Sequence, residues 1–167
     1  MSYITINEFL KDWEQESSAT LKVLSALTDE SLNVKVYDEG RTLGFIAWHL
    51  AVTLQEMCSR AGLMISASNI EEESPVFAEI ILKSYDKLSK SLVQGLNLNW
   101  NDNSLSEEVE MYGEMWTKSQ VLDSLVKHQI HHRGQITVLM RQAGLKVPGF
   151  YGPSKEEWES MGLQPPM

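Results

Sequence analysis

Three of the four histidines in this 167-residue sequence fall within one short stretch, His128-Gln-Ile-His131-His132. On a helix, His128 and His132 lie one turn apart on the same face, with their β-carbons roughly 6 Å apart. Two imidazoles at this spacing can bind one metal ion, provided that a further ligand comes from elsewhere in the chain. The stretch therefore indicates part of a metal site.

The remaining histidine, His49, is the one ionisable side chain between Thr42 and Leu54. A helix this apolar on every side is normally a buried, central element, so His49 should be desolvated. His49, His128 and His132 together would supply three nitrogen ligands and leave positions open, which is typical of catalytic rather than structural zinc sites. Zinc or nickel is the expected divalent ion, and iron or manganese is also compatible. The alternative is that each histidine is a hydrogen-bonded core residue without a metal.

The elements that would position these histidines are four long helical patterns separated by turn residues. Their expected ranges are residues 5–28, 42–61, 74–95 and 117–143. Capping boxes at Thr5 and Thr117 mark the first and fourth starts, and Gly62, Gly95 and Gly144 mark three of the ends. Four long helices predict an all-α, up-and-down four-helix bundle.

The inward face of a helix is indicated by apolar residues spaced three and four apart. In the third pattern this face holds Phe77, Ile80, Ile81, Leu88 and Leu92. In the fourth it holds Val121, Leu125, His128, His132, Ile136 and Leu139. Two histidines thus take positions that would ordinarily hold Leu or Ile, where an imidazole without a polar partner is costly. Gly134, in the same pattern, is expected to allow close approach of a neighbouring helix.

Two further segments are predicted outside the four helices. Residues 97–116 are polar, rich in asparagine and interrupted by Gly113, which favours an irregular segment with a short hairpin around residues 109–115. Ser154 and Glu157 have the spacing of a capping box for one short helix near the end of the chain. A chain of this length fits a single domain covering residues 1–167.

Composition narrows the classes of partner. The chain carries 14 Lys and Arg against 23 Asp and Glu, and a net charge of -9 repels the phosphates of nucleic acids. No apolar run is long enough to span a bilayer, and the N-terminal residues are too acidic for a secretory leader. We therefore expect a cytoplasmic protein with a small-molecule substrate and without a nucleic-acid or membrane partner. Cys58, the single cysteine, should be a buried apolar residue rather than a nucleophile.

Several side chains near the histidines could support a site. His131 should point beside the ligand pair, toward a neighbouring helix or a ligand imidazole. Arg133 and Gln135 could orient the ligand imidazoles or meet an anionic substrate, and a surface ion pair is an equal alternative for Arg133. Trp48 and Trp116 are the aromatic residues expected near a pocket.

These residues resemble the DinB and YfiT-like superfamily of metal-dependent enzymes. The matching pieces are Ile46-Ala47-Trp48-His49-Leu50, His128-Gln-Ile-His131-His132-Arg133-Gly134-Gln135, and Leu139-Met140-Arg141-Gln142-Ala143-Gly144 with the following Pro148 and Tyr151-Gly152-Pro153. The resemblance implies a four-helix bundle, often a homodimer, that holds one ion through His49, His128 and His132. It also implies chemistry with low-molecular-weight thiols, as in thiol S-transferases and a thiol-dependent isomerase, or else hydrolysis.

Three functions follow as hypotheses. The first is a metal-dependent transferase in which a bound thiol is deprotonated by the ion, without a dedicated general base. The second is metal-assisted hydrolysis, which needs a group to move protons, with Glu56 and His131 as candidates. The third is a non-catalytic, stress-related binding protein. No residue in the sequence selects a particular thiol or electrophile, and the catalytic residues beyond the metal ligands are not predicted.

Overall fold

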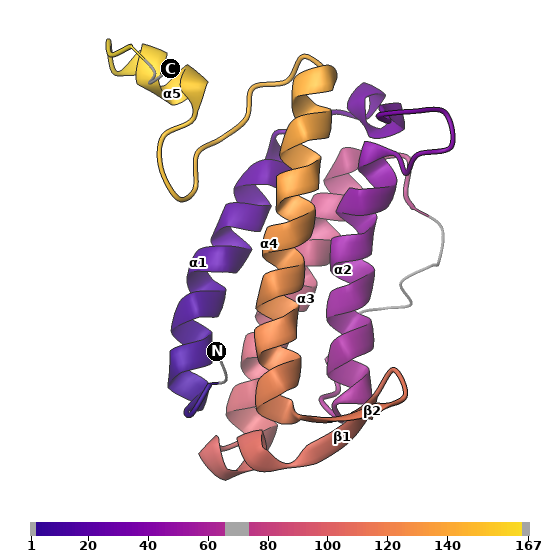
Figure 1. The fold of residues 1–167 in the computed structure, drawn as a ribbon, viewed down its shortest axis with the longest axis vertical. Helices are drawn as coiled ribbons and strands as arrows, with labels where there is room; N and C mark the ends of the chain where they lie inside the picture. Colours follow the sequence, from indigo (N-terminus) through magenta and orange to yellow (C-terminus); the bar gives the residue numbers. More distant parts are fainter. Residues whose placement is uncertain (1–2, 66–73, 165–167) are drawn as a thin grey trace.

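The computed structural model describes residues 3–65 and 74–164, in which four long helices lie side by side (Figure 1). They are α1 (Ile6–Ser25), α2 (Leu43–Arg60), α3 (Ala78–Asn99) and α4 (Lys118–Gln142). Helices α1 and α2 each pack against both α3 and α4, so the four form a closed ring around one core. The predicted all-α four-helix bundle is confirmed.

Three of these helices begin where the sequence predicts. The Thr5 hydroxyl accepts the backbone N–H of Glu8, and Thr117 and Gln120 form the same reciprocal capping box ahead of α4. Thr42 caps α2 by accepting the N–H of Phe45. Each cap satisfies a backbone donor that the first turn of a helix leaves without a partner.

Helix α3 differs from its prediction at both ends. It starts at Ala78, because the backbone N–H of Ala78 is accepted by the carboxylate of Asp29, at 2.7 Å, rather than by a local cap. It continues past Gly95, which is buried inside the helix against the side chains of Leu63 and Ile65. Phe77 and Ile80 are 54% and 46% exposed, so these two residues of the predicted inward stripe lie outside the core.

The helix directions do not alternate throughout the ring. The N-terminus of α3 meets Asp29, just after α1 ends, and Asp102, just after α3 ends, accepts the N–H of Ile6 at the start of α1. Ser119, at the start of α4, donates to the carbonyl of Tyr3. Helices α2 and α3 therefore run in one direction while α1 and α4 run in the other (Figure 1). The predicted up-and-down order is thus wrong at the α2–α3 step, because α3 starts at the same end of the bundle as α2.

Short elements close the two ends of the bundle. A 3-10 turn, η1 (Glu30–Asn33), lies in the α1–α2 connection, and a second one, η2 (Asp102–Ser106), follows α3. The predicted hairpin is present as β1 (Glu108–Met111) and β2 (Glu114–Thr117), paired antiparallel across Tyr112 and Gly113, which both have positive φ. The predicted terminal helix is α5 (Lys155–Ser160), capped by Ser154 and Glu157 as expected.

The core is apolar and continuous between the four helices. Its largest fully buried side chains include Phe9, Trp13, Tyr85, Leu50, Leu54 and Leu92. In the part of the chain that the structure describes, no helix has the length and apolar character needed to cross a membrane. The α2–α4 contact, where the histidines lie, forms one wall of this core.

Candidate metal centre

His128 and His132 lie one turn apart on α4, and their ring centroids are 4.3 Å apart. His49 projects from α2, and its ring centroid lies 4.9 Å from that of His128 and 4.8 Å from that of His132. One ring nitrogen from each histidine lies within 4.8 Å of the others, a grouping that could hold a metal ion. The structure thus brings together the three residues that were predicted from the sequence as metal ligands.

The donor set fits a zinc-type ion. His49 Nε2 and His128 Nε2 are 3.2 Å apart. Two zinc–nitrogen bonds of about 2.0–2.1 Å at a tetrahedral angle place their nitrogens roughly 3.3 Å apart, close to this distance. His128 Nδ1 is buried without a hydrogen-bond partner among the described residues. Nε2 of His128, which faces His49, is then the nitrogen that would bind the ion, and Nδ1 carries the ring proton.

The charge state of the three imidazoles favours ligation. Burial, followed by the neighbouring His132 and Arg41, lowers the pKa of His49. Burial and the surrounding histidines lower the pKa of His128 to about 3. Burial also lowers the pKa of His132, against the opposing effect of its hydrogen bond to Gln135. All three rings are therefore neutral at pH 7, which is the form that binds a metal.

Two side chains hold the ligand rings in place. His132 Nδ1 donates to Gln135 Oε1 at 2.7 Å, which leaves Nε2 of the same ring as the nitrogen with a free lone pair. The hydroxyl of Thr53 lies 3.3 Å from His49 Nδ1. Because the Thr53 hydroxyl also lies 3.4 Å from His49 Nε2, it restricts the orientation of that ring without selecting a tautomer, whereas Gln135 fixes both the tautomer and the orientation of His132.

A stripe along α2 leads from His49 to the N-terminal end of the helix. Phe45, His49 and Thr53 are spaced four apart on α2 and so share one face, and Arg41 lies just before the helix, next to its cap Thr42. The ring of Phe45 stacks on that of His49 at 6.2 Å, and the guanidinium of Arg41 lies 4.9 Å above the ring of Phe45. The positive charge of Arg41 therefore lies close to the histidines, in agreement with its lowering of the pKa of His49 and His132.

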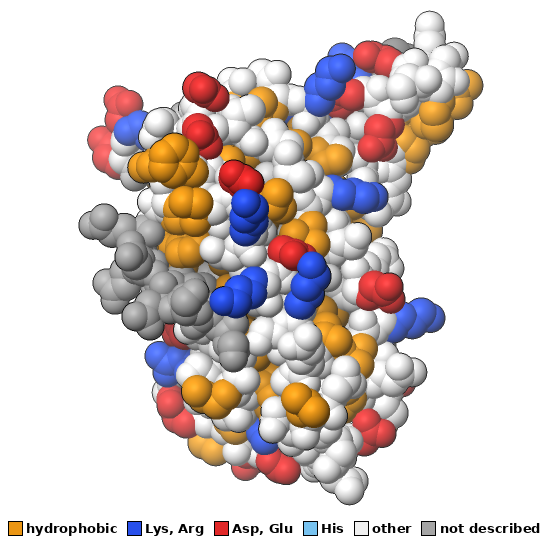
Figure 2. All heavy atoms as spheres, turned by 180° about the vertical axis from the view of Figure 1, so that it is seen from behind, with side chains coloured by type: hydrophobic (Ala, Val, Ile, Leu, Met, Phe, Trp, Pro, Cys, Tyr) orange, Lys and Arg blue, Asp and Glu red, His pale blue; other side chains and the backbone are white. Residues whose placement is uncertain are grey.

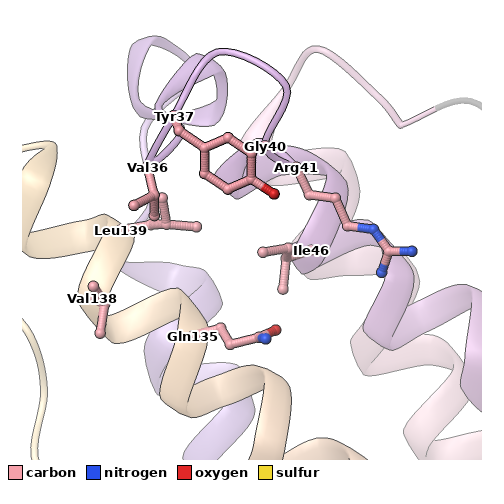
Figure 3. A pocket seen from close by; sticks show the side chains of 8 residues that line it. All are labelled: Val36, Tyr37, Gly40, Arg41, Ile46, Gln135, Val138 and Leu139. Atoms are coloured by element: carbon pink, nitrogen blue, oxygen red, sulfur yellow. The ribbon is translucent and has the colours of Figure 1, made fainter.

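A cavity of about 320 Å³ opens beside this stripe (Figure 3). It is lined by Val36, Tyr37, Gly40, Arg41, Ile46, Gln135, Val138 and Leu139. None of the three histidines lines this cavity, but Gln135 belongs both to its lining and to the hydrogen bond with His132, so one side chain separates the cavity from His132. Its size is within the range of small-molecule sites.

With this geometry established, the chain was compared with known proteins, and the model of the DinB family matches residues 1–167. The chain belongs to the DinB family. The resemblance read from the W-H-L and HxxHHRGQ stretches is therefore confirmed at the level of the family.

The chain is also similar to individual proteins and solved structures. The chain is 44% identical over 162 residues to the Bacillus subtilis (strain 168) protein YrdA, with 97% of each covered. A crystal structure of a DinB-like protein from Bacillus cereus ATCC 10987 superposes with a TM-score of 0.85 at 39% identity, covering 88% of this chain and 98% of that one. The DinB-like protein YjoA of B. subtilis shares the fold, with a TM-score of 0.68 at 15% identity, covering 88% and 99% respectively.

Arg133 does not have the role that the sequence suggested. It is 1% exposed, faces α1 rather than the histidines, and forms a buried ion pair with Glu16. Its guanidinium also donates to the Glu16 carbonyl at 3.0 Å and to Thr20, and Tyr151 donates to the Glu16 carboxylate at 2.6 Å. Neither orientation of the ligand rings nor a surface ion pair describes Arg133 in this DinB family chain.

His131 lies beside the candidate centre, as its helical position predicts. It is exposed, and its ring centroid is 4.8 Å from that of His132. Glu56, the other candidate for moving protons, forms an ion pair with Arg60 at 3.0 Å. Neither residue belongs to the group of three that could hold an ion.

The two tryptophans expected near a pocket do not line this cavity. Trp48 is buried in the core, and Trp116 lies on the hairpin, where its indole N–H donates to Glu114. Cys58 is buried as expected, and burial raises the pKa of its thiol to about 12, which makes it a poor nucleophile.

The side of the bundle formed by α3, opposite the histidines, faces the solvent. Figure 2 shows basic and acidic side chains interspersed over the side on which α3 lies, and no histidine is visible among the residues coloured there. Lys83 pairs with Glu79 and Lys90 with Asp86, one turn apart on α3. The candidate centre is thus covered from this direction.

Sequence reasoning missed three residues that complete the surroundings of the histidines: Arg41, Phe45 and Thr53. For Phe45 and Thr53 the signal was the spacing of four from His49, which puts both on its face of α2, whereas Arg41 precedes the helix and has no such signal. Because α2 is apolar on nearly every side, that face could not be distinguished from the others by hydrophobic periodicity.

Proposed function

We propose that His49, His128 and His132 bind one divalent metal ion, zinc or nickel, and that the protein is a metal-dependent transferase that uses a low-molecular-weight thiol. The observation that carries this proposal is the convergence of three neutral imidazoles from two helices, without a carboxylate in the group. A bound divalent ion lowers the pKa of a coordinated thiol and so supplies a thiolate at neutral pH.

The residues around the centre have supporting roles in this proposal. Gln135 and Thr53 orient the rings of His132 and His49, and the half-buried position of His49 and His128 limits access of water. The cavity next to Gln135 offers room for a small substrate beside the histidines. No side chain has to act as a general base, because the ion itself favours the thiolate.

Hydrolysis is the weaker candidate, since the groups named for proton transfer are engaged or turned away. Glu56 is paired with Arg60, and His131 is exposed beside the centre rather than directed into it. A non-catalytic binding protein would not need a cavity that ends next to a ligand-orienting residue. The homodimer and the cytoplasmic location stay predictions.

The deciding experiment measures metal content by plasma mass spectrometry on protein purified without a histidine tag or chelator. We expect about one ion per chain in wild type, and none in the variant with His49→Ala, His128→Ala and His132→Ala. The matched control is His131→Ala, which removes the adjacent exposed histidine and should keep the ion. Equal metal content in wild type and the triple variant would refute the site.

Activity is then tested with a panel of small thiols and a chromogenic electrophile such as 1-chloro-2,4-dinitrobenzene. Conjugation should require both the ion and the three histidines, and should survive in His131→Ala. Conjugation that persists in the triple variant would exclude the transferase mechanism. Ester or amide hydrolysis that depends on the ion, without conjugation of any thiol, would favour the hydrolase instead.

A further inference from the structure

The cavity beside the histidines combines apolar walls with polar groups at its rim. Val36, Ile46, Val138 and Leu139 supply the apolar surface. The polar groups come from Tyr37, Arg41 and Gln135. Figure 3 shows Tyr37 and Gln135 on opposite sides of the opening, and Arg41 at its edge with the guanidinium extended along α2. A site of this composition suits a molecule with an apolar body and a polar end.

Arg41 differs from the other arginines of the chain in its charge partners. Arg60, Arg133 and Arg141 each form an ion pair with a glutamate. Among the described residues, Arg41 has no carboxylate partner, although it is positioned by the ring of Phe45 at 4.9 Å. Because its guanidinium makes no ion pair with a described residue, its N–H groups remain available for a planar, bidentate acceptor such as a carboxylate.

Tyr37 provides a second donor at the same rim. Its hydroxyl has no hydrogen bond to any described residue, and Figure 3 shows it directed toward the space next to Ile46. Gly40 permits this arrangement, because a β-carbon there would lie 3.1 Å from the ring of Tyr37. A larger residue at position 40 would push the Tyr37 ring aside by a few tenths of an ångström.

Gln135 connects the rim to the histidines. Its Oε1 accepts from His132, so its amide N–H groups are left to face the cavity. A molecule held at Arg41 would therefore extend along the apolar walls with its other end next to Gln135.

We propose that this cavity binds the carboxylate group of an amphiphilic small-molecule substrate through Arg41 and Tyr37, and directs the opposite end of that molecule toward His49, His128 and His132. The role as a substrate rests on the proposed function, whereas the carboxylate binding itself needs no metal. The substrate class is thus a small organic acid with an apolar body.

The test compares two probes of the same shape, 4-phenylbutyrate and its neutral amide, by titration calorimetry. Both are titrated into metal-free and zinc-loaded protein, so that a carboxylate binding to the ion is separated from one binding at Arg41. In wild type we expect the carboxylate to bind about tenfold more tightly than the amide in both forms, since hydrogen bonds to charged groups exceed neutral ones by this order.

Arg41→Gln keeps a polar side chain but removes the charge, and should abolish the preference for the carboxylate. Arg41→Lys keeps the charge without the planar fork and should retain only part of it. The matched control is Arg60→Gln, which makes the same change at an exposed arginine outside the cavity, at the far end of α2, and should leave the preference intact. Metal content and melting temperature are expected to be unchanged in all three variants, because both arginines are exposed.

Three outcomes would overturn the proposal: equal binding of both probes to wild type, an unchanged preference in Arg41→Gln, or a preference that appears only with zinc and ignores Arg41. If wild type fails to bind metal yet shows the Arg41-dependent preference, the proposed function fails while the carboxylate site stands. Loss of the preference in Arg41→Gln with normal metal content would support the site.

Discussion

His132 is the candidate ligand whose orientation is fixed most directly. It is 8% exposed, and its Nδ1 donates to Gln135 Oε1 at 2.7 Å. The i and i+3 positions of this pair were readable from the sequence, as was the i, i+4 spacing of His128 and His132. The distance between His49 and that pair was not, because it depends on how α2 packs against α4.

Replacement of Gln135 by Met should weaken metal binding without removing a ligand. Met has a similar length but cannot accept the Nδ1 proton of His132, so the ring loses its preferred tautomer and orientation. We expect the zinc affinity to fall about 10- to 100-fold, measured by competition with a chromogenic chelator.

The control for this variant is Gln142→Met, the same exchange at an exposed position two turns further along α4. Gln142→Met should bind zinc as wild type does. An unchanged zinc affinity in Gln135→Met would mean that the Gln135 hydrogen bond does not contribute to the ligand geometry.

At the scale of elements, α4 presents two polar faces to two different helices. His128 and His132 face α2, while Gln129, one position after His128, contacts Thr20 of α1 and Tyr85 of α3. Arg133, one position after His132, faces α1. Local signals predicted the limits of α1, α2 and α4, since their caps lie in the adjacent sequence. The start of α3 was missed because its cap, Asp29, is remote in sequence, and the end was missed because Gly95 provides space for Leu63 instead of a helix stop.

Gly134 gives a prediction for α4 itself. The expected close helix approach is wrong, because Gly134 is exposed and a β-carbon there would meet no atom within 4 Å. Gly134→Ala should therefore raise the free energy of unfolding by about 0.8–1.0 kcal/mol, through helix propensity alone. Urea denaturation followed by circular dichroism measures this change.

Gly144→Ala, just after the end of α4, should change stability in the opposite direction. Gly144 has φ of +74°, a left-handed conformation that a β-carbon disfavours, so this variant should lose about 1 kcal/mol. A Gly134→Ala variant that is less stable than wild type would reveal a contact on this face of α4.

At the scale of the whole molecule, one buried network joins α1, α4 and the segment after α4. Arg133 pairs with Glu16, and Tyr151 donates to the same carboxylate while its ring lies 5.3 Å from the guanidinium. Burial and the hydrogen bond to Glu16 raise the pKa of Tyr151 to about 12, so its hydroxyl remains a donor at neutral pH. The sequence could not predict this network, since an arginine next to a ligand histidine is equally compatible with the surface or the site.

Arg133→Met should be strongly destabilising, because it leaves the Glu16 carboxylate buried without its partner. We expect a loss of about 3–5 kcal/mol in the free energy of unfolding, measured by urea denaturation. The control is Arg141→Met, which breaks an ion pair with Glu156 at the surface of the same helix and should cost at most about 1 kcal/mol.

The double variant Glu16→Met with Arg133→Met separates the pair from its surroundings. If desolvation of an unpaired charge is the main penalty, removal of both charges should recover much of the stability lost in Arg133→Met. A double variant as unstable as the sum of the two single variants would instead mean that each residue acts through its other contacts, Thr20 for Arg133 and Tyr151 for Glu16. Because Arg133 and His132 are adjacent on α4, metal content measured on the same variants shows whether this network also holds the histidine face of the helix in position.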